Sequence, residues 1–187
     1  MTNRSRLFFA LWPDDKTREA ISHLRLSLNT NGFKWVKPNN FHITLVFLGS
    51  VDNNTAQLIK QSIANISVQP FTLYFNQLAY WRKPKILCLT CQQPTEIVKI
   101  TNLATDIKKI AATFDLNTDT QPFTPHITLA RDAFFLPEIH FEPIIWSADS
   151  FCLVESCAEP DGVCYKVIQQ WALPTITEQT DVYTAGA

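Results

Sequence analysis

The chain has 187 residues, 46% of them hydrophobic and 18% charged, which is the composition of a globular protein. Its formal net charge of −1 gives no overall basic field, so any contact with nucleic acid must be local. No run of about 18 uninterrupted apolar residues occurs, and we therefore expect no membrane-spanning helix.

The first half of the chain alternates strands and helices. Apolar periodicity and turn residues predict a strand at 7–11, a helix at 13–29 and a short extended segment at 34–36. They further predict a strand at 41–49 and a helix from 53 to about 66. Gly49 is expected to end its strand, and Asp52 or Asn53 is expected to cap the second helix.

The second half adds two strands, a long helix, a further strand and a hairpin, at 71–81, 86–90, 94–114, 126–131 and 150–173, with the hairpin turn at 160–162. This order predicts an α+β fold with mainly antiparallel sheets and three helices outside. We place one domain at 1–175 and a polar C-terminal tail at 176–187.

The five cysteines form an odd set, which argues against a disulfide framework and favours a reducing, cytoplasmic location. Cys88 and Cys91 have the spacing of a CxxC pair, but they lie in a strand-like segment without a second such pair or a nearby histidine. We expect them to be buried as small hydrophobic side chains rather than to bind metal or act in redox chemistry.

One tetrapeptide occurs twice: His-Ile-Thr-Leu stands at His42–Leu45 and again, letter for letter, at His126–Leu129. Because side chains alternate along a strand, each copy places its histidine and threonine on one face and its two apolar residues on the other. Packing does not require a histidine followed two residues later by a threonine. We interpret the copies as two halves of one site that encloses a small anion, and we expect His23 and His140 at the surface or in structural positions.

A facing pair of histidines suits a reaction with two proton transfers. Imidazole titrates near pH 6.5, so one ring can accept a proton while the other donates one, and threonine hydroxyls can bind phosphoryl oxygens. The sequence lacks the HExxH, Walker, GxGxxG and GxSxG signatures of other common enzyme classes. Opening of a cyclic phosphodiester by water, without metal or other cofactor, is the reaction that remains.

The sequence resembles the 2H phosphoesterases, and within them the RNA 2′,3′-cyclic phosphodiesterases, also called 2′-5′ RNA ligases. The similarity runs from about Arg6 to Leu173 and includes RLFFALWPDDKTR, KWVKPNNFHITLVFLG, YWRKPKILCL, PFTPHITLAR and SFCLVES followed by DGVCYKVIQQWAL. It implies a two-lobed, pseudo-symmetric fold whose sheets face a central cleft. It also implies metal-independent hydrolysis of a terminal 2′,3′-cyclic phosphate to a 2′-phosphomonoester.

The resemblance further implies the roles of individual residues. His42 would protonate the departing 3′-oxygen and His126 would activate water, while the phosphate would be held by Thr44, Thr128 and Arg131. Strict alternation places Arg131 on the face opposite His126, so a bulge or a strand end is needed for it to reach the phosphate. The first motif has Phe47 at this offset, so only one half supplies the cation.

The expected partners are RNA ends or small cyclic nucleotides, with no membrane and no obligate protein partner. Residues 80–85 combine aromatic and basic side chains, which are compatible either with stacking of a base and contact with the RNA backbone or with a solvated loop anchored by its tryptophan. Ligation through a 2′-5′ linkage, described for family members, is the same step with a ribose hydroxyl in place of water. Two alternatives stay open: another substrate, such as ADP-ribose cyclic phosphate or a 2′-5′ oligoadenylate, and a noncatalytic RNA-end or nucleotide binder that uses the same cleft.

Overall fold

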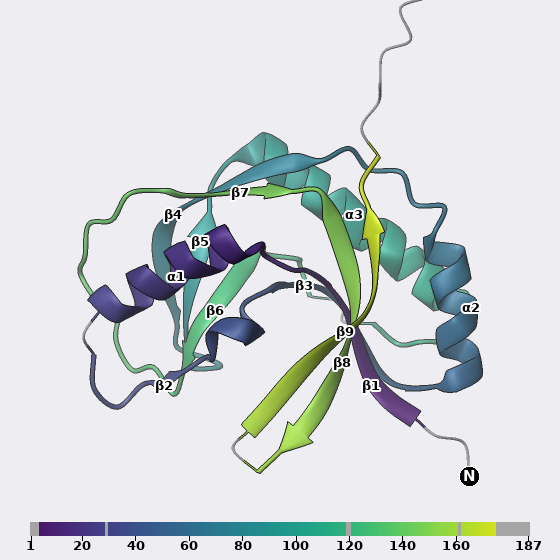
Figure 1. Ribbon diagram of the computed structural model, residues 1–187, viewed down its shortest axis with the longest axis horizontal. Helices are drawn as coiled ribbons and strands as arrows, with labels where there is room; N and C mark the ends of the chain where they lie inside the picture. The colour runs from purple at the N-terminus through teal and green to yellow at the C-terminus, as the bar shows by residue number, and fades with distance from the viewer. Residues whose placement is uncertain (1–3, 29, 119–120, 161, 175–187) are drawn as a thin grey trace, which may run out of the picture.

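The computed structural model describes residues 4–28, 30–118, 121–160 and 162–174 (Figure 1). The predicted tail at 176–187 lies outside these residues, as do Asn29 at the end of the first predicted helix and Asp161 in the predicted turn. Among the described residues, no helix combines the length and the apolar character needed to cross a membrane.

The first sheet has the strand order β3–β1–β8–β9, and all neighbouring strands are antiparallel. Its strands span, in that order, Ile43–Asp52, Arg4–Leu11, Ser150–Glu159 and Gly162–Ala172. Strands β8 and β9 form the predicted hairpin, which extends away from the helices (Figure 1).

The prediction that Gly49 ends its strand is wrong, because β3 continues to Asp52. Gly49 has a φ of 72° and lies opposite Leu7, next to a register shift between β1 and β3. A glycine adopts this left-handed conformation without a steric penalty, so the strand passes through an irregularity there instead of stopping.

The second sheet is also antiparallel throughout and has the strand order β2–β6–β5–β4–β7. Its strands span, in that order, Lys34–Trp35, His126–Arg131, Ile86–Cys91, Phe71–Trp81 and Ile144–Ala148. Every residue of β5 is buried, so Cys88 and Cys91 are core residues, as predicted. All five cysteines are free thiols.

In the described part of the chain, three α-helices and one 3-10 helix accompany the sheets: α1 at Asp15–Ser27, η1 at Pro38–Asn40, α2 at Asn53–Ile63 and α3 at Pro94–Ala112. Asp52 caps α2, as predicted, by accepting a hydrogen bond from the Thr55 backbone N–H at 3.0 Å. Helix α3 contacts β3 of the first sheet and β4 of the second, whereas α1 contacts β7. The α3 helix therefore joins the two sheets.

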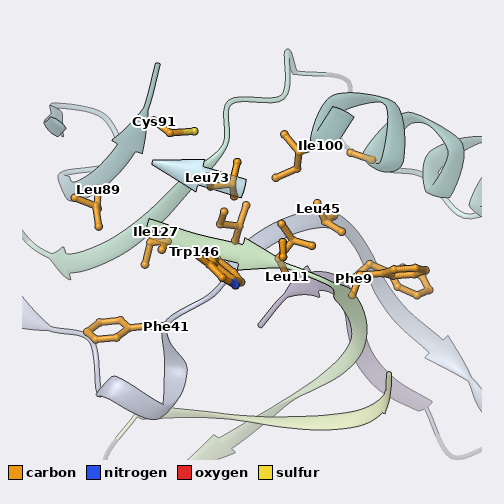
Figure 2. Close-up of a cluster of buried hydrophobic side chains, with 14 of the residues drawn as sticks. Phe9, Leu11, Phe41, Leu45, Leu73, Leu89, Cys91, Ile100, Ile127 and Trp146 are labelled. Carbon is orange, nitrogen blue, oxygen red and sulfur yellow. The ribbon is translucent and has the colours of Figure 1, made fainter. Parts of the chain in front are cut away.

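A continuous apolar core connects the sheets (Figure 2). Phe9 and Leu45 of the first sheet belong to the same cluster as Leu73 and Ile127 of the second. The isoleucine and the leucine of both repeated tetrapeptides are buried in it. Because side chains alternate along a strand, this anchoring directs the histidine and the threonine of each copy away from the core.

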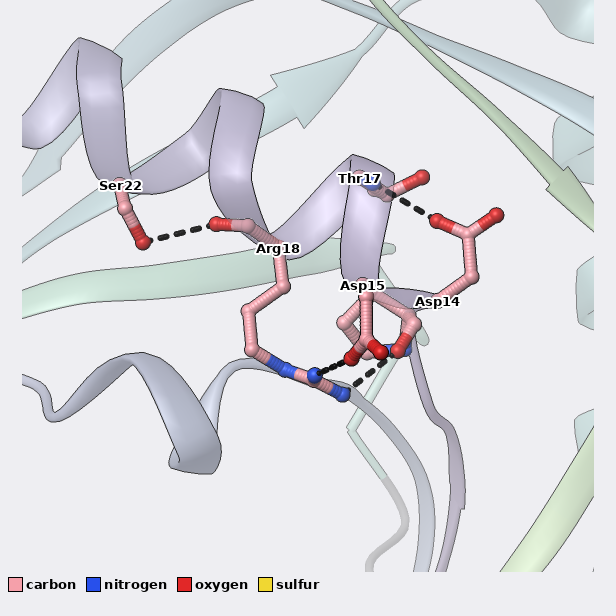
Figure 3. Close-up of polar contacts among 6 residues, drawn as sticks. Asp14, Asp15, Thr17, Arg18 and Ser22 are labelled. Atoms are coloured by element: carbon pink, nitrogen blue, oxygen red, sulfur yellow. Dashed lines mark hydrogen bonds and ion pairs between the residues drawn. The ribbon is translucent and has the colours of Figure 1, made fainter.

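The junction between β1 and α1 is held by three polar contacts (Figure 3). The Asp14 carboxylate caps α1 by accepting a hydrogen bond from the Thr17 N–H at 2.7 Å. Arg18 donates to the Pro13 carbonyl oxygen at 2.8 Å and also pairs with Asp15. These contacts fix the chain directly after Trp12, which follows the last residue of β1.

Candidate active site

A cleft of about 450 Å³ is lined by residues of both sheets. The sequence predicted five functional side chains, and all five line this cleft: His42, Thr44, His126, Thr128 and Arg131. His42 directly precedes β3 and Thr44 lies near the start of that strand, whereas the other three residues belong to β6. The two repeated motifs therefore contribute to the same cavity.

Each motif contains a β-bulge at its leucine. In the pairing of β1 with β3, Ala10 lies opposite Thr44 and Phe9 opposite Val46, so Leu45 is the extra residue. In the pairing of β5 with β6, the register likewise skips Leu129. The halves of the site therefore share a backbone irregularity as well as a sequence.

The bulge at Leu129 explains how Arg131 reaches the cleft. Leu129 and Ala130 are buried in succession, so the alternation of side chains shifts by one position and returns Arg131 to the face of His126 and Thr128. This is the bulge that the sequence analysis required. The corresponding shift at Leu45 brings Phe47 to the cleft.

Both histidine rings are oriented by the backbone. The His42 Nδ1 lies 2.7 Å from the Asn40 carbonyl oxygen, and the His126 Nδ1 lies 2.8 Å from the Thr124 carbonyl oxygen. A carbonyl only accepts, so Nδ1–H donates in both contacts and Nε2 is the atom left for proton transfer. In the neutral ring of His42, Nε2 accepts a hydrogen bond from the Thr44 hydroxyl at 3.0 Å.

Several aromatic side chains contact the His42 ring. Trp12 stacks on the ring with a centroid distance of 5.6 Å, and Phe8 and Tyr165 lie at 5.1 Å and 5.0 Å. Tyr165 comes from β9, and the hairpin is tied to η1 by a hydrogen bond of 2.8 Å from the Asn40 side-chain amide to the Val163 carbonyl. By contrast, the ring contact of His126 is Trp81, at 4.5 Å.

Trp12, Tyr165 and Cys88 are further neighbours of the site that were not predicted from the sequence. Cys88 lies opposite Thr128 in the register of β5 and β6, and burial raises the pKa of its thiol. Trp12 had a local signal, because an aromatic side chain at the end of β1 adjoins the strand that carries His42. Tyr165 had none, because only the path of the hairpin brings it there.

Burial lowers the pKa of both histidines. The pKa of His42 falls to about 4, mainly because the ring is desolvated. The hydrogen bond to Asn40 opposes this shift, whereas the nearby charges of His126 and Arg131 lower the pKa further. The pKa of His126 is lowered by desolvation and by Arg131, against the hydrogen bond to Thr124. Both rings are therefore neutral at pH 7 in the empty cleft.

The lining of the cleft is basic although the chain as a whole is not. Its charged residues are Lys34, Lys37 and Arg131, and no carboxylate is among the described residues that line it. Lys34 is paired with Asp132 at 2.7 Å, whereas Arg131 forms no ion pair with any carboxylate in the described ranges. An anion in the cleft would therefore meet Arg131 without a competing partner.

A smaller hollow of about 230 Å³ adjoins the cleft on the side of His126. The two cavities share Thr44, Phe47 and His126, and the hollow adds the aromatic side chains of Trp81 and Phe123. These rings provide an apolar surface next to His126.

The other two histidines lie away from the cleft. His23 is exposed, with its Nε2 3.8 Å from Glu19 on the same helix, and His140 is exposed in the segment before β7. Both positions agree with the expectation for these residues. Within the described part of the chain, no group of three His, Cys, Asp or Glu side chains is arranged to hold a metal ion.

Comparison with known proteins identifies the family. Residues 11–88 match the family model described as LigT like phosphoesterase. A protein of Escherichia coli K12 named RNA 2′,3′-cyclic phosphodiesterase is 30% identical over 177 residues, which cover 92% of this chain and 99% of that relative. This chain belongs to the RNA 2′,3′-cyclic phosphodiesterase family.

Other relatives agree with this assignment to the LigT-like phosphoesterases. An Archaeoglobus fulgidus protein of the same name is 28% identical over 174 residues, covering 86% of this chain and 96% of its own length. The crystal structure of E. coli LigT complexed with 3′-AMP has a TM-score of 0.84 at 28% identity and covers 92% of this chain and 100% of that one. The predicted α+β fold with two antiparallel sheets is thus confirmed.

Proposed function

We propose that this family member opens the 2′,3′-cyclic phosphate at an RNA end to a 2′-phosphomonoester, with water as the nucleophile. The observation that carries the proposal is the pair of His42 and His126 in one cleft, each oriented by a hydrogen bond from Nδ1 to a backbone carbonyl. Two such rings suit one proton acceptor and one proton donor. The names of the relatives support the choice of substrate.

In the proposed reaction His126 takes a proton from water, and the water oxygen forms a bond to phosphorus. The bond between phosphorus and the 3′-oxygen breaks, and His42 gives a proton to that oxygen. The phosphate remains on the 2′-oxygen. Thr44, Thr128 and Arg131 stabilise the phosphoryl oxygens as their charge increases in the transition state.

The low pKa of His42 places a condition on its role as the acid. The ring is neutral at pH 7 in the empty cleft, so it must acquire its proton together with the substrate. The negative charge of a bound phosphodiester beside the ring favours the imidazolium and raises the pKa of His42. Binding of the anionic substrate thus favours the protonated form of His42, which can act as the acid.

We place the terminal nucleoside in the hollow beside His126. Trp81 and Phe123 line it and provide faces on which a base can stack, and Phe47 borders both cavities. Trp81 belongs to the 80–85 segment, for which the sequence left open base stacking or a solvated loop. A ribose 5′-hydroxyl that replaces water at phosphorus would give 2′-5′ ligation with the same two proton transfers.

The proposal is tested with cytidine 2′,3′-cyclic phosphate and excess EDTA, with ³¹P NMR to identify the product. We expect ring opening at an undiminished rate and a product with phosphate on the 2′-oxygen only. Loss of activity on chelation would refute the metal-free reaction, and a 3′-phosphate would refute the assigned leaving group. Binding of the nucleotide without turnover would instead indicate the noncatalytic alternative.

A further inference from the structure

The chemistry of the substrate leaves one direction for the rest of an RNA chain. A 2′,3′-cyclic phosphate is bonded to both the 2′- and the 3′-oxygen of the terminal ribose, so the polymer continues only through the 5′-carbon. Any further subsite must therefore hold the preceding nucleotide. The cleft extends beyond the catalytic groups to the segment at residues 34–37 and to the tip of the β8–β9 hairpin.

Trp35 forms an aromatic wall in this extension. The ring is half-buried, and the guanidinium group of Arg25 lies 5.6 Å from its centroid, with Phe33 at 5.8 Å. The backbone is fixed as well, because Trp35 pairs with Ala130 and the next N–H, of Val36, donates to the Leu129 carbonyl at 2.9 Å. A ring that is already held in place loses little conformational freedom when a base stacks on it.

Lys37 supplies a cation in the same extension. Lys34 is engaged with Asp132, but Lys37 forms no ion pair with any carboxylate in the described ranges. Arg131 is assigned to the reacting phosphate, so Lys37 is the lining cation that is left for a second phosphate. An aromatic surface beside a cation is the usual combination in sites that bind single-stranded nucleic acid.

We propose that this extension binds the nucleotide that precedes the cyclic-phosphate end, with its base on Trp35 and its connecting phosphate beside Lys37. The inference rests on the proposed function and specifies its substrate: an RNA end of at least two nucleotides is preferred over a cyclic mononucleotide. The preference is a difference in binding, because the second nucleotide touches none of the reacting atoms.

The test compares three probes: cytidine 2′,3′-cyclic phosphate, the dinucleotide adenylyl-(3′,5′)-cytidine 2′,3′-cyclic phosphate, and the same dinucleotide without its adenine. For the unmodified chain we expect the dinucleotide to have a kcat/KM at least tenfold above that of the mononucleotide, and the abasic probe to fall between them. A stacked base is worth roughly 1–3 kcal/mol in such sites, which is about 5- to 150-fold.

Two variants separate the base from the phosphate. With Trp35→Leu, the ratio of kcat/KM between the dinucleotide and its abasic form should fall to about one. With Lys37→Ala, the ratio of kcat/KM between the abasic dinucleotide and the mononucleotide should fall. In addition, the slope of log kcat/KM for the dinucleotide against the logarithm of the salt concentration should become shallower by about 0.7. Lys16→Ala is the matched control, because Lys16 is exposed on α1 and does not line the cleft.

The failure of this inference can be distinguished from the failure of the proposed function. If none of the probes is opened, the proposed function itself is wrong. If all three are opened with the same kcat/KM, the function stands and the second-nucleotide site is refuted. A preference for the dinucleotide that survives both substitutions refutes the assignment to Trp35 and Lys37.

Discussion

Trp12 stacks on the imidazole of His42, with the ring centroids 5.6 Å apart and the ring planes inclined by only 12°. Trp12 directly follows β1, and the capped start of α1 fixes the chain beyond it. The stack covers one face of the ring, and desolvation is the main cause of the low pKa of His42. We therefore expect Trp12 to influence the proposed reaction only through His42, as a positioning residue.

Replacing Trp12 should therefore change a pH profile. In Trp12→Leu, water reaches the His42 ring, so the pKa of His42 rises toward 6.5. The pH dependence of kcat/KM reports the free protein, and its maximum should move to higher pH. Trp171→Phe is the control, because Trp171 packs on Phe9 and Phe151 instead. A maximum that stays in place would show that Trp12 does not desolvate His42.

Under the proposed mechanism, removal of either His42 or His126 should abolish most of the activity. We expect His42→Ala and His126→Ala each to lower kcat by roughly 10²–10⁴, because each removes one of the two proton transfers. The double variant should be little worse than either single one, since the two groups act as a unit. His23→Ala, which changes an exposed histidine, should keep full activity. A single variant with more than about a tenth of the original kcat would contradict its assigned role.

Arg131 should contribute as a donor to the phosphate. We expect Arg131→Ala to lower kcat/KM by about 10²-fold, in the range measured for the loss of one well-placed donor, and Arg131→Lys to recover part of it as a point charge. Arg4→Ala removes a cation whose side chain is bound to Ser50, outside the cleft lining, and should have no effect. Steady-state kinetics on the cyclic dinucleotide would measure all three. Equal rates for the Arg131 and Arg4 variants would exclude a contact with the phosphate.

The half-buried, desolvated His42 should also make stability depend on pH. Between pH 6.5 and about 4 the unfolded chain binds a proton at this residue that the folded chain does not. The free energy of unfolding therefore falls as the pH is lowered through this window, by roughly 3 kcal/mol in total for this group. Urea unfolding of the unmodified chain and of His42→Asn at pH 7 and pH 4.5 would measure it. The variant should lose less stability on acidification, and parallel losses would contradict the inference.

Much of the candidate site could be predicted from local sequence. The repeated tetrapeptide identified both histidines and both threonines, because strand periodicity links each to buried apolar neighbours. The same periodicity revealed that Arg131 needed a bulge. It could not locate the bulge, which depends on how Leu129 is accommodated against β5.

Local patterns were less informative wherever the backbone departs from regular geometry. Gly49 reads as a strand end, yet antiparallel pairing with β1 carries β3 on to Asp52. The hairpin was predicted from its turn, but nothing near it in sequence indicates that Tyr165 packs against His42. Contacts between residues this distant along the chain arise from the packing of whole sheets and have no local periodicity.

The sequence by itself indicated which side chains are the candidates for the proposed chemistry and which of their neighbours are buried, because both inferences follow from residue type and strand alternation. Only the tertiary structure decided that the two motifs line one cleft, that His42 lies among Trp12, Phe8 and Tyr165, and that His126 does not. The physical reason is that desolvation and charge depend on every group within a few ångströms, and the fold gathers those groups from strands far apart in the chain.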